Sequence, residues 1–472
     1  MLPVKGRMQK ISNHFDNYLG KDRTESESYQ GVQTFIGITE NNLTEVHLGQ
    51  GKLLELILNP SNMNLAYKRV RSNKGSFGID KLSTEHLQEW LLKHKESLIE
   101  SLEKGKYKPQ AVRRVEIPKE GGKTRSLGIP TVVDRLVQQS IIQILTPIYE
   151  QEFHTSSHGF RPKRGCHTAL KEVESHLNDE YCYVVDLDLE KFFDTVNHSR
   201  LIELLSKKVK DPRVISLIHK YLRAGVVVVN KFEESVLGVP QGGPLSPLLS
   251  NIMLHELDKE LARRGHRFVR YADDCLIFCK SKRACLRVKE SITAFIESVL
   301  YLRVNKEKTT VGYIRGKKFL GYSFYNKSKG KWGLCVHPKS YGKLKDRLKE
   351  ITNRSNGMGY EKIKELLRYY LQGWISYFKL ADMSNKIKRI DEWLRFRIRM
   401  LIWKSWKKIS TKYNNLKKIG VKDNQAYQWA NTRKGYCRTA LSPILQITLK
   451  MQTLRKAGYT FLTDMYLKCI VN

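Results

Sequence analysis

The segment Phe268–Phe278, F-V-R-Y-A-D-D-C-L-I-F, restricts the possible folds most, because it places two adjacent aspartates between short β-prone runs. Val, Phe, Ile and Tyr on both sides favour strands, so the pattern predicts a hairpin with Asp273 and Asp274 at its connection. Two like charges at a turn are explained if they bind a cation. Carboxylate oxygens are the ligands that magnesium prefers, and phosphate oxygens of a substrate can complete its coordination shell. A solvated turn is the alternative for this motif by itself.

A second acidic strand is predicted upstream at Tyr183–Leu189, Y-V-V-D-L-D-L. Asp186 and Asp188 alternate with apolar residues and therefore share one face of the strand. A carboxylate among Val and Leu is costly unless it is paired or binds a metal. Structural pairing with Lys or Arg is one explanation. We favour the other, in which two acidic strands bring three carboxylates around two metal ions that act on a 3′-hydroxyl and a leaving pyrophosphate.

The charge of the chain predicts a polyanionic partner. Its 472 residues carry 84 Lys and Arg against 47 Asp and Glu, a formal net charge of +37, which favours RNA or DNA as the ligand. An acidic membrane is the alternative, but no apolar run approaches 18 residues and the N-terminus lacks the apolar core of a signal peptide. We therefore expect a soluble, cytoplasmic protein. Its eight cysteines form no C-x-x-C pair, which is typical of reduced thiols and argues against a zinc module.

A chain of this length predicts two or three domains. Residues 1–50 are polar and add nothing to the basic excess, so they are expected to be a poorly ordered extension. From residue 331 to residue 472 there are 31 Lys and Arg against 9 Asp and Glu, together with six of the seven tryptophans. This basic region is the part of the chain that we expect to bind nucleic acid.

Apolar residues at helical spacing predict two helices in the basic region, at Glu361–Leu380 and Lys386–Ile409. In the second helix, Arg395, Arg399, Lys407 and Lys408 are expected to project away from the apolar face, so that the helix can lie along a phosphate backbone. The aromatic residues are expected mostly in the core, with base stacking by Trp403 or Trp406 as the alternative.

Two further segments have nucleotide-binding features. Val239–Pro247, V-P-Q-G-G-P-L-S-P, predicts a tight loop followed by a helix with Ser246 as its N-cap. Ile117–Pro130 predicts a β-hairpin with a glycine turn and basic arms that can hold a triphosphate. Each segment is also compatible with an ordinary surface turn.

Seven motifs occur in one order, and together they resemble the reverse transcriptases of bacterial group II introns, the intron-encoded reverse transcriptase and maturase family. The similarity extends from about Leu53 to the C-terminus. The motifs are I-P-K-E-G-G-K-T-R-S-L-G-I-P, S-H-G-F-R-P-K-R-G (Ser157–Gly165), V-D-L-D-L-E-K-F-F-D-T-V-N-H (Val185–His198), G-V-P-Q-G-G-P-L-S-P, R-Y-A-D-D, L-R-V-N-K-E-K-T (Leu302–Thr309) and F-L-G-Y-S-F (Phe319–Phe324).

The resemblance implies an α+β right-hand polymerase fold, with fingers and a palm whose antiparallel sheet is backed by helices, followed by an α-helical thumb and maturase domain. It places the fingers and palm at residues 51–330 and the thumb at 331–430. A C-terminal nucleic-acid-binding segment is expected at 431–472.

The resemblance also assigns the site. It implies that Asp188, Asp273 and Asp274 are catalytic, that Asp188 and Asp273 bind two Mg²⁺ ions, which Mn²⁺ can replace, and that Phe193 is a steric gate favouring dNTPs. The implied substrate-binding residues are Lys119 and Arg125 at the triphosphate, Gln241 at the nucleotide and template, and Lys308 near the phosphates. Lys306 is the alternative to Lys308.

The activity implied by the resemblance is copying of intron RNA into cDNA, combined with binding of that RNA to promote its splicing and mobility. Intron RNA, a DNA target or primer and dNTPs are the implied partners. The H-N-H endonuclease module of longer relatives is not expected. A maturase that keeps the polymerase fold only for RNA binding is one alternative, and a reverse transcriptase of a retron, defence or diversity-generating element is another.

Overall fold

The computed structural model describes residues 52–118, 122, 124–228, 231–327, 330–355 and 357–471. The chain forms two compact units that divide between Tyr313 and Ile314. The sequence predicted that the fingers and palm extend to residue 330. In the structure, β9 (Tyr322–Asn326) and β10 (Trp332–Val336) lie on either side of that residue and pair with each other within the second unit. The extension predicted at residues 1–50 lies outside the described residues.

The first unit contains a four-stranded sheet, here called the central sheet. Its order is β6 (Arg267–Tyr271), β7 (Asp274–Cys279), β3 (Tyr183–Leu187) and β8 (Thr310–Tyr313). All three pairings are antiparallel, as expected for the palm. Successive residues of β7 point to opposite faces, and Cys275 to Cys279 are all buried, so both faces of this strand are covered.

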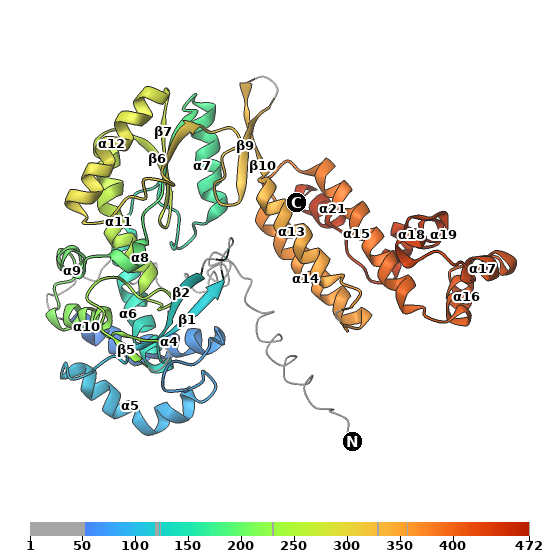
Figure 1. Cartoon of the computed structure of the whole chain (residues 1–472). Helices are drawn as coiled ribbons and strands as arrows, with labels where there is room; N and C mark the ends of the chain where they lie inside the picture. Colours follow the sequence, from blue (N-terminus) through green and yellow to red (C-terminus); the bar gives the residue numbers. More distant parts are fainter. Residues whose placement is uncertain are drawn as a thin grey trace, which may run out of the picture. The chain divides into compact units, whose positions relative to one another are not determined.

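Helices pack against the central sheet and against each other in one continuous hydrophobic core. Figure 1 shows α12 along the sheet and α11 beside α8 and α9. The helices of this unit are α3 (Leu53–Leu58), α4 (Pro60–Ser72), α5 (Leu87–Glu103), α6 (Val132–Glu150), α7 (Cys166–Asn178), α8 (Phe192–Thr195), α9 (His198–Ser206), α10 (Pro212–Leu222), α11 (Ser246–Arg263) and α12 (Lys282–Val299).

A second sheet of the first unit contains the predicted basic hairpin. Its order is β2 (Thr124–Ile129), β1 (Val112–Pro118), β4 (Val226–Val228) and β5 (Lys231–Glu233). β1 and β2 pair antiparallel from Arg113↔Ile129 to Pro118↔Thr124, which confirms the hairpin. β1 and β4 pair in parallel and join segments that are far apart in the sequence.

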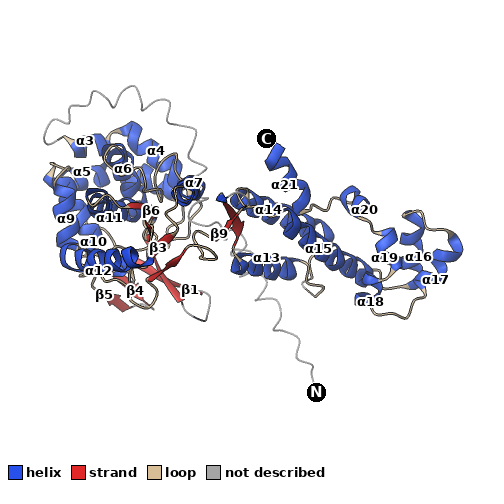
Figure 2. Cartoon of the chain, turned by 90° about the horizontal axis from the view of Figure 1, so that it is seen from above, coloured by secondary structure: helices blue, strands red, loops and turns tan. Residues whose placement is uncertain are grey.

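The second unit is mainly helical (Figures 1 and 2). α14 (Tyr360–Phe378) and α15 (Ser384–Ser405) correspond to the two predicted helices. The apolar stripe of α14 is buried at Ile363, Leu367 and Leu371. The remaining helices are α13 (Pro338–Ile351), α16 (Ile409–Lys418), α17 (Asp423–Ala430), α18 (Tyr436–Leu441), α19 (Pro443–Thr448), α20 (Met451–Lys456) and α21 (Leu462–Val471).

The arginines predicted to face nucleic acid on α15 have structural partners instead. Arg399 donates from Nε to the Leu449 carbonyl at 3.0 Å, and Arg395 lies 3.6 Å from the Met451 sulfur. Both side chains are half-buried, because the C-terminal part of the chain packs on α15. Trp403 is buried, as the packing interpretation predicted.

The C-terminal helices are held to α15 by polar contacts at both of its ends. Asp391, near the start of α15, accepts hydrogen bonds from the backbone N–H groups of Leu462 (2.9 Å) and Thr463 (2.8 Å), where α21 begins. Near the other end, Met400 contacts Cys437 of α18. Asp391 is buried, so it acts as an interior cap for α21.

Replacing Asp391 with Ala is expected to destabilise the second unit by roughly 2 kcal/mol or more, because buried N–H groups lose their acceptor. Urea unfolding followed by tryptophan fluorescence measures this change. Glu392→Ala is the matched control, since Glu392 is the next residue of α15 and is exposed. Equal destabilisation by the two substitutions would contradict the capping role.

Candidate active site

The acidic hairpin of the central sheet has a tight turn. Tyr271 ends β6 and pairs with Asp274, the first residue of β7, so Ala272 and Asp273 form the connection. Ala272 has φ of 57°, a left-handed conformation that is uncommon for a residue with a side chain. The turn therefore needs support from neighbouring groups, and it presents the two aspartates at one edge of the sheet.

The second acidic strand ends at the same edge. β3 lies beside β7 with Leu187 opposite Cys275, so Asp188 follows the strand where Asp274 begins β7. Asp186 pairs with Leu276 on one side and Thr310 on the other, inside the sheet. The antiparallel register therefore brings Asp188 next to the acidic turn, and Asp186 lies further from that edge.

A lysine from the segment before β8 reaches Asp188. Lys308 Nζ lies 3.4 Å from Asp188 Oδ1, and 63% of the lysine side chain is exposed. The backbone around it is fixed, because Asn305 N–H donates to the Asp188 carbonyl at 2.9 Å and the Thr309 hydroxyl contacts the same carbonyl at 3.3 Å. Lys308 rather than Lys306 is thus the lysine that contacts the acidic edge.

The donor set at this edge suits a hard divalent cation. Asp188, Asp273 and Asp274 supply carboxylate oxygens, which match the ligand preference of Mg²⁺ and Mn²⁺. Among the described residues, no group of three or more His, Cys, Asp and Glu side chains is close enough to hold one metal ion. Oxygens of a substrate would have to complete the coordination, as in sites that bind metal together with a triphosphate.

The basic hairpin and the glycine-rich loop meet in a direct hydrogen bond. Arg125 Nε on β2 donates to Gln241 Oε1 at 2.8 Å, and Gly128 N–H donates to the Gln241 carbonyl at 2.7 Å. Two residues far apart in the sequence, both predicted to bind substrate, are therefore neighbours. Lys119, predicted beside Arg125, lies outside the described residues.

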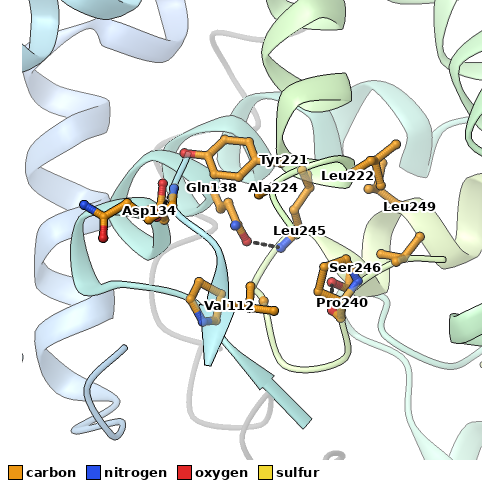
Figure 3. A pocket seen from close by; sticks show the side chains of 14 residues that line it. Val112, Asp134, Gln138, Tyr221, Leu222, Ala224, Pro240, Leu245, Ser246 and Leu249 are labelled. Atoms are coloured by element: carbon orange, nitrogen blue, oxygen red, sulfur yellow. Dashed lines mark hydrogen bonds between the residues drawn. The ribbon is translucent and has the colours of Figure 1, made fainter. Parts of the chain in front are cut away.

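The loop that carries Gln241 is anchored on three elements. Gly242 has φ of 118°, and a Cβ there would lie 2.7 Å from the Gly128 carbonyl oxygen, so only glycine fits without a shift. Ser246 donates from its hydroxyl to the Pro240 carbonyl at 2.6 Å (Figure 3). Ser246 was predicted to be the N-cap, but it is the first residue of α11, and Leu245 occupies the N-cap position. On α6, Gln138 Oε1 accepts from Leu245 N–H at 3.4 Å (Figure 3).

The pocket behind this loop, drawn in Figure 3, is small. It is lined by residues such as Val112, Tyr221 and Leu249, and its volume of about 20 Å³ has room for water but not for a nucleotide. This pocket is therefore too small to be the nucleotide site.

Phe193 lies in α8 and its side chain is only 8% exposed. Its carbonyl accepts a hydrogen bond from Val239 N–H at 2.6 Å, which ties it to the start of the glycine-rich loop. Its ring lies edge-on to Phe192, with centroids 5.2 Å apart. Phe193 thus packs in the core and also adjoins the loop that contains Gln241.

The residues that support the acidic turn were not predicted from the sequence. Arg270 of β6 is completely buried and forms an ion pair with Asp258 of α11, with Nε 2.7 Å from Oδ1. Gly159 lies directly against the turn, since a Cβ on it would come within 2.2 Å of Ala272 N. Two features of the sequence could have indicated this pair. Arg270 is a charged residue within the apolar run F-V-R-Y-A, and Asp258 is an aspartate on an otherwise apolar face of its helix.

The loop that contains Gly159 is itself fixed by buried polar contacts. His158 contacts Thr168 Oγ1 at 2.8 Å through Nδ1 and Glu172 Oε2 at 2.7 Å through Nε2. Burial raises the pKa of Glu172, but the hydrogen bond from His158 and the nearby ring of His176 outweigh it and lower the pKa to about 2. Glu172 is therefore ionised at neutral pH and holds the loop against α7.

Among the described helices, none combines the length and apolar character needed to cross a membrane.

Two family descriptions match this chain. Residues 117–324 match "Reverse transcriptase (RNA-dependent DNA polymerase)", and residues 342–420 match "Group II intron, maturase-specific domain". The first match contains both acidic strands and the glycine-rich loop. The second runs from α13 to α16.

Several known proteins are similar in sequence. Protein YkfC of Escherichia coli (strain K12) is 35% identical over 327 residues, covering 60% of this chain and 85% of that protein. The group II intron-encoded protein LtrA of Lactococcus lactis subsp. cremoris is 34% identical over 352 residues, covering 60% of this chain. The matched region spans 58% of LtrA, less than two thirds of its length.

A solved structure, a partial Cas6-RT-Cas1–Cas2 complex, is 26% identical and covers 52% of this chain and 42% of that chain, with a TM-score of 0.34. The sequence matches, together with two acidic strands adjacent in an antiparallel sheet, define the class as RNA-dependent DNA polymerases. Within that class, the chain belongs to the family of group II intron-encoded reverse transcriptases and maturases.

Gly159→Ala is expected to lower primer extension at least about 100-fold, because the added methyl group collides with the backbone of the acidic turn and a shift of about 1 Å at a catalytic group has that effect. Gly165→Ala, in the same motif, is the control, since a Cβ there has no neighbour within 4 Å. Steady-state primer extension measures the difference, with the melting temperature of each variant recorded. Unchanged activity in Gly159→Ala would contradict the close packing of Gly159 on the turn.

Proposed function

We propose that this protein copies RNA into DNA at the edge of the central sheet formed by Asp188 and the β6–β7 turn. The observation that carries the proposal is the register of β3 and β7, in which Asp188 follows Leu187 opposite the start of β7. Acidic residues of two adjacent strands lie at this edge, and a basic hairpin lies in the same unit.

Two Mg²⁺ ions, or Mn²⁺ in their place, held by Asp188 and Asp273 would lower the pKa of the primer 3′-hydroxyl and stabilise the leaving pyrophosphate. Asp274 would support Asp273 from the first position of β7. Lys308 compensates the charge of Asp188 in the absence of substrate and would turn to the phosphates when a nucleotide binds. Its 63% exposure leaves it room for that movement.

The nucleotide would lie against the basic hairpin and the glycine-rich loop, where the two segments meet at Arg125 and Gln241. Arg125 would bind the triphosphate, together with Lys119 from the turn of the same hairpin. The hydrogen bond from Arg125 to Gln241 sets the orientation of the guanidinium group and couples it to the residue that we assign to the nucleotide and template. Phe193 would crowd a ribose 2′-hydroxyl from beneath this loop and so favour dNTPs.

The nucleic-acid partners follow from charge and family. A net charge of +37 supports binding of an RNA template and a DNA primer or target. We propose intron RNA as both the template and the splicing partner, bound in part by the maturase-specific region at residues 342–420. In this role the protein stabilises the active RNA fold, and the RNA performs the transesterification.

A cytoplasmic location is part of the proposal. None of the eight cysteines forms a disulfide bond in the structure, which agrees with a reducing compartment.

Asp273→Asn is expected to abolish RNA-templated DNA synthesis, with a loss of at least about 1000-fold, because it removes a metal-binding charge without changing side-chain size. Primer extension with dNTPs and Mg²⁺ is the measurement. Asp194→Asn, an exposed aspartate of the neighbouring α8, is the control and should retain activity. If the folded wild type bound RNA but made no DNA, the protein would be a maturase that uses the polymerase fold only for binding.

The same Asp273→Asn variant is expected to support splicing of the host intron RNA at the wild-type rate, since the proposed splicing role needs binding and not polymerisation. Splicing of intron transcripts at low Mg²⁺, with and without protein, measures this. Absence of stimulation by the wild type on any flanking intron RNA would favour a reverse transcriptase of a different element.

A further inference from the structure

Arg270 is the largest of the completely buried side chains in the described part of the chain, and it lies three residues before Asp273. A buried charge is costly unless every hydrogen-bonding group on it is satisfied. The contacts of this guanidinium therefore show which parts of the fold it joins.

All five N–H donors of Arg270 have acceptors. Nε and Nη2 bind the two carboxylate oxygens of Asp258 at 2.7 and 2.5 Å. Nη2 also donates to Ser157 Oγ at 2.8 Å, and Nη1 donates to Asn251 Oδ1 at 3.0 Å. The last bond runs from Nη1 to the carbonyl of Ala272 at 3.0 Å. One planar group thus joins α11, the loop before α7 and the acidic turn.

The bond to Ala272 acts directly on the turn. Ala272 has a positive φ, and its carbonyl belongs to the peptide bond that links it to Asp273. Fixing this carbonyl fixes the orientation of that peptide plane, from which the Asp273 side chain projects. The loop before α7 also packs on the turn, where Gly159 lies against Ala272 N and its carbonyl accepts a hydrogen bond from Asn251 Nδ2 at 2.9 Å.

Stability alone is a weak explanation for this arrangement. Apolar residues of similar volume often replace a buried ion pair without loss of stability. An apolar side chain at residue 270 would, however, leave the Ala272 carbonyl without its buried donor. The charge of Arg270 is paired with that of Asp258, and its direct contact with the turn is the hydrogen bond to the Ala272 carbonyl.

We propose that Arg270 is a positioning residue for metal binding, which holds Asp273 and Asp274 at the distance from Asp188 that a divalent ion requires. This inference rests on the proposed function, because it assumes that these carboxylates bind metal. Asp258 in turn holds the guanidinium in the one orientation that reaches Ala272.

The test is Mn²⁺ binding, measured by electron paramagnetic resonance on the full chain with an RNA template, a dideoxy-terminated primer and the next dNTP. Arg270→Lys keeps the charge but cannot reach Asp258 and the Ala272 carbonyl together. It is expected to weaken Mn²⁺ binding by about 10- to 100-fold, the usual effect of losing a partner that orients metal ligands. In primer extension, kcat should fall while KM for the template–primer stays unchanged.

Ser157→Ala is a milder variant for the case in which Arg270→Lys fails to fold. It removes one acceptor of the guanidinium, leaves the ion pair intact, and should weaken Mn²⁺ binding several-fold. Asp211→Asn is the matched control. Asp211 is also buried and accepts hydrogen bonds from Leu54 N–H (3.1 Å) and from Arg213, so its replacement should lower the melting temperature without changing Mn²⁺ binding.

Wild-type Mn²⁺ affinity in a folded Arg270→Lys protein, or in Ser157→Ala if the first variant does not fold, would overturn the positioning role. Equal weakening in Asp211→Asn would also overturn it, because general destabilisation would then explain the result. If Asp273→Asn bound Mn²⁺ as tightly as the wild type, the proposed metal site itself would be wrong. If Mn²⁺ binding were lost in Asp273→Asn but unchanged in Arg270→Lys, the metal site would stand and only the positioning role of Arg270 would fail.

Discussion

The buried guanidinium of Arg270 ties together the parts of the first unit that the candidate active site requires. It pairs with Asp258 on α11, binds Ser157 in the loop before α7, and donates to the carbonyl of Ala272 in the acidic turn. Because a planar group with fixed donor directions satisfies all these acceptors at once, none of the three segments can shift independently. The site is therefore held by rigid elements rather than by the turn alone.

The rest of the site depends on strand order. β3 lies between β7 and β8, although β7 and β8 follow it by many residues in the chain. This position of β3 places Asp188 beside the acidic turn and within reach of Lys308. A comparable long-range contact joins Arg125 of the basic hairpin to Gln241 of the glycine-rich loop. The motifs that carry these residues are each compatible with an ordinary strand or turn, so the contacts between them are what defines the candidate site.

The second unit uses its basic residues in two ways. Arg395 and Arg399 pack against the C-terminal part of the chain, and Arg397 donates to the carbonyl of Thr352. These side chains stabilise the helical unit, whereas exposed cations such as Lys407 and Lys408 stay available to a polyanion. Charge counted along the sequence therefore overestimates the surface that nucleic acid can reach.

The sequence by itself determined the elements and the family. Hydrophobic spacing predicted α14 and α15, and a glycine turn between two short arms predicted the β1–β2 hairpin. The seven ordered motifs predicted the polymerase fold that the family matches confirm. Local patterns suffice for these because helix and strand periods are written in neighbouring residues. Only the tertiary structure decided that Arg270 pairs with Asp258, that Gly159 supports the turn, and that Arg399 is structural. Those roles depend on which distant segments meet, and a buried arginine and an exposed one look alike in a sequence.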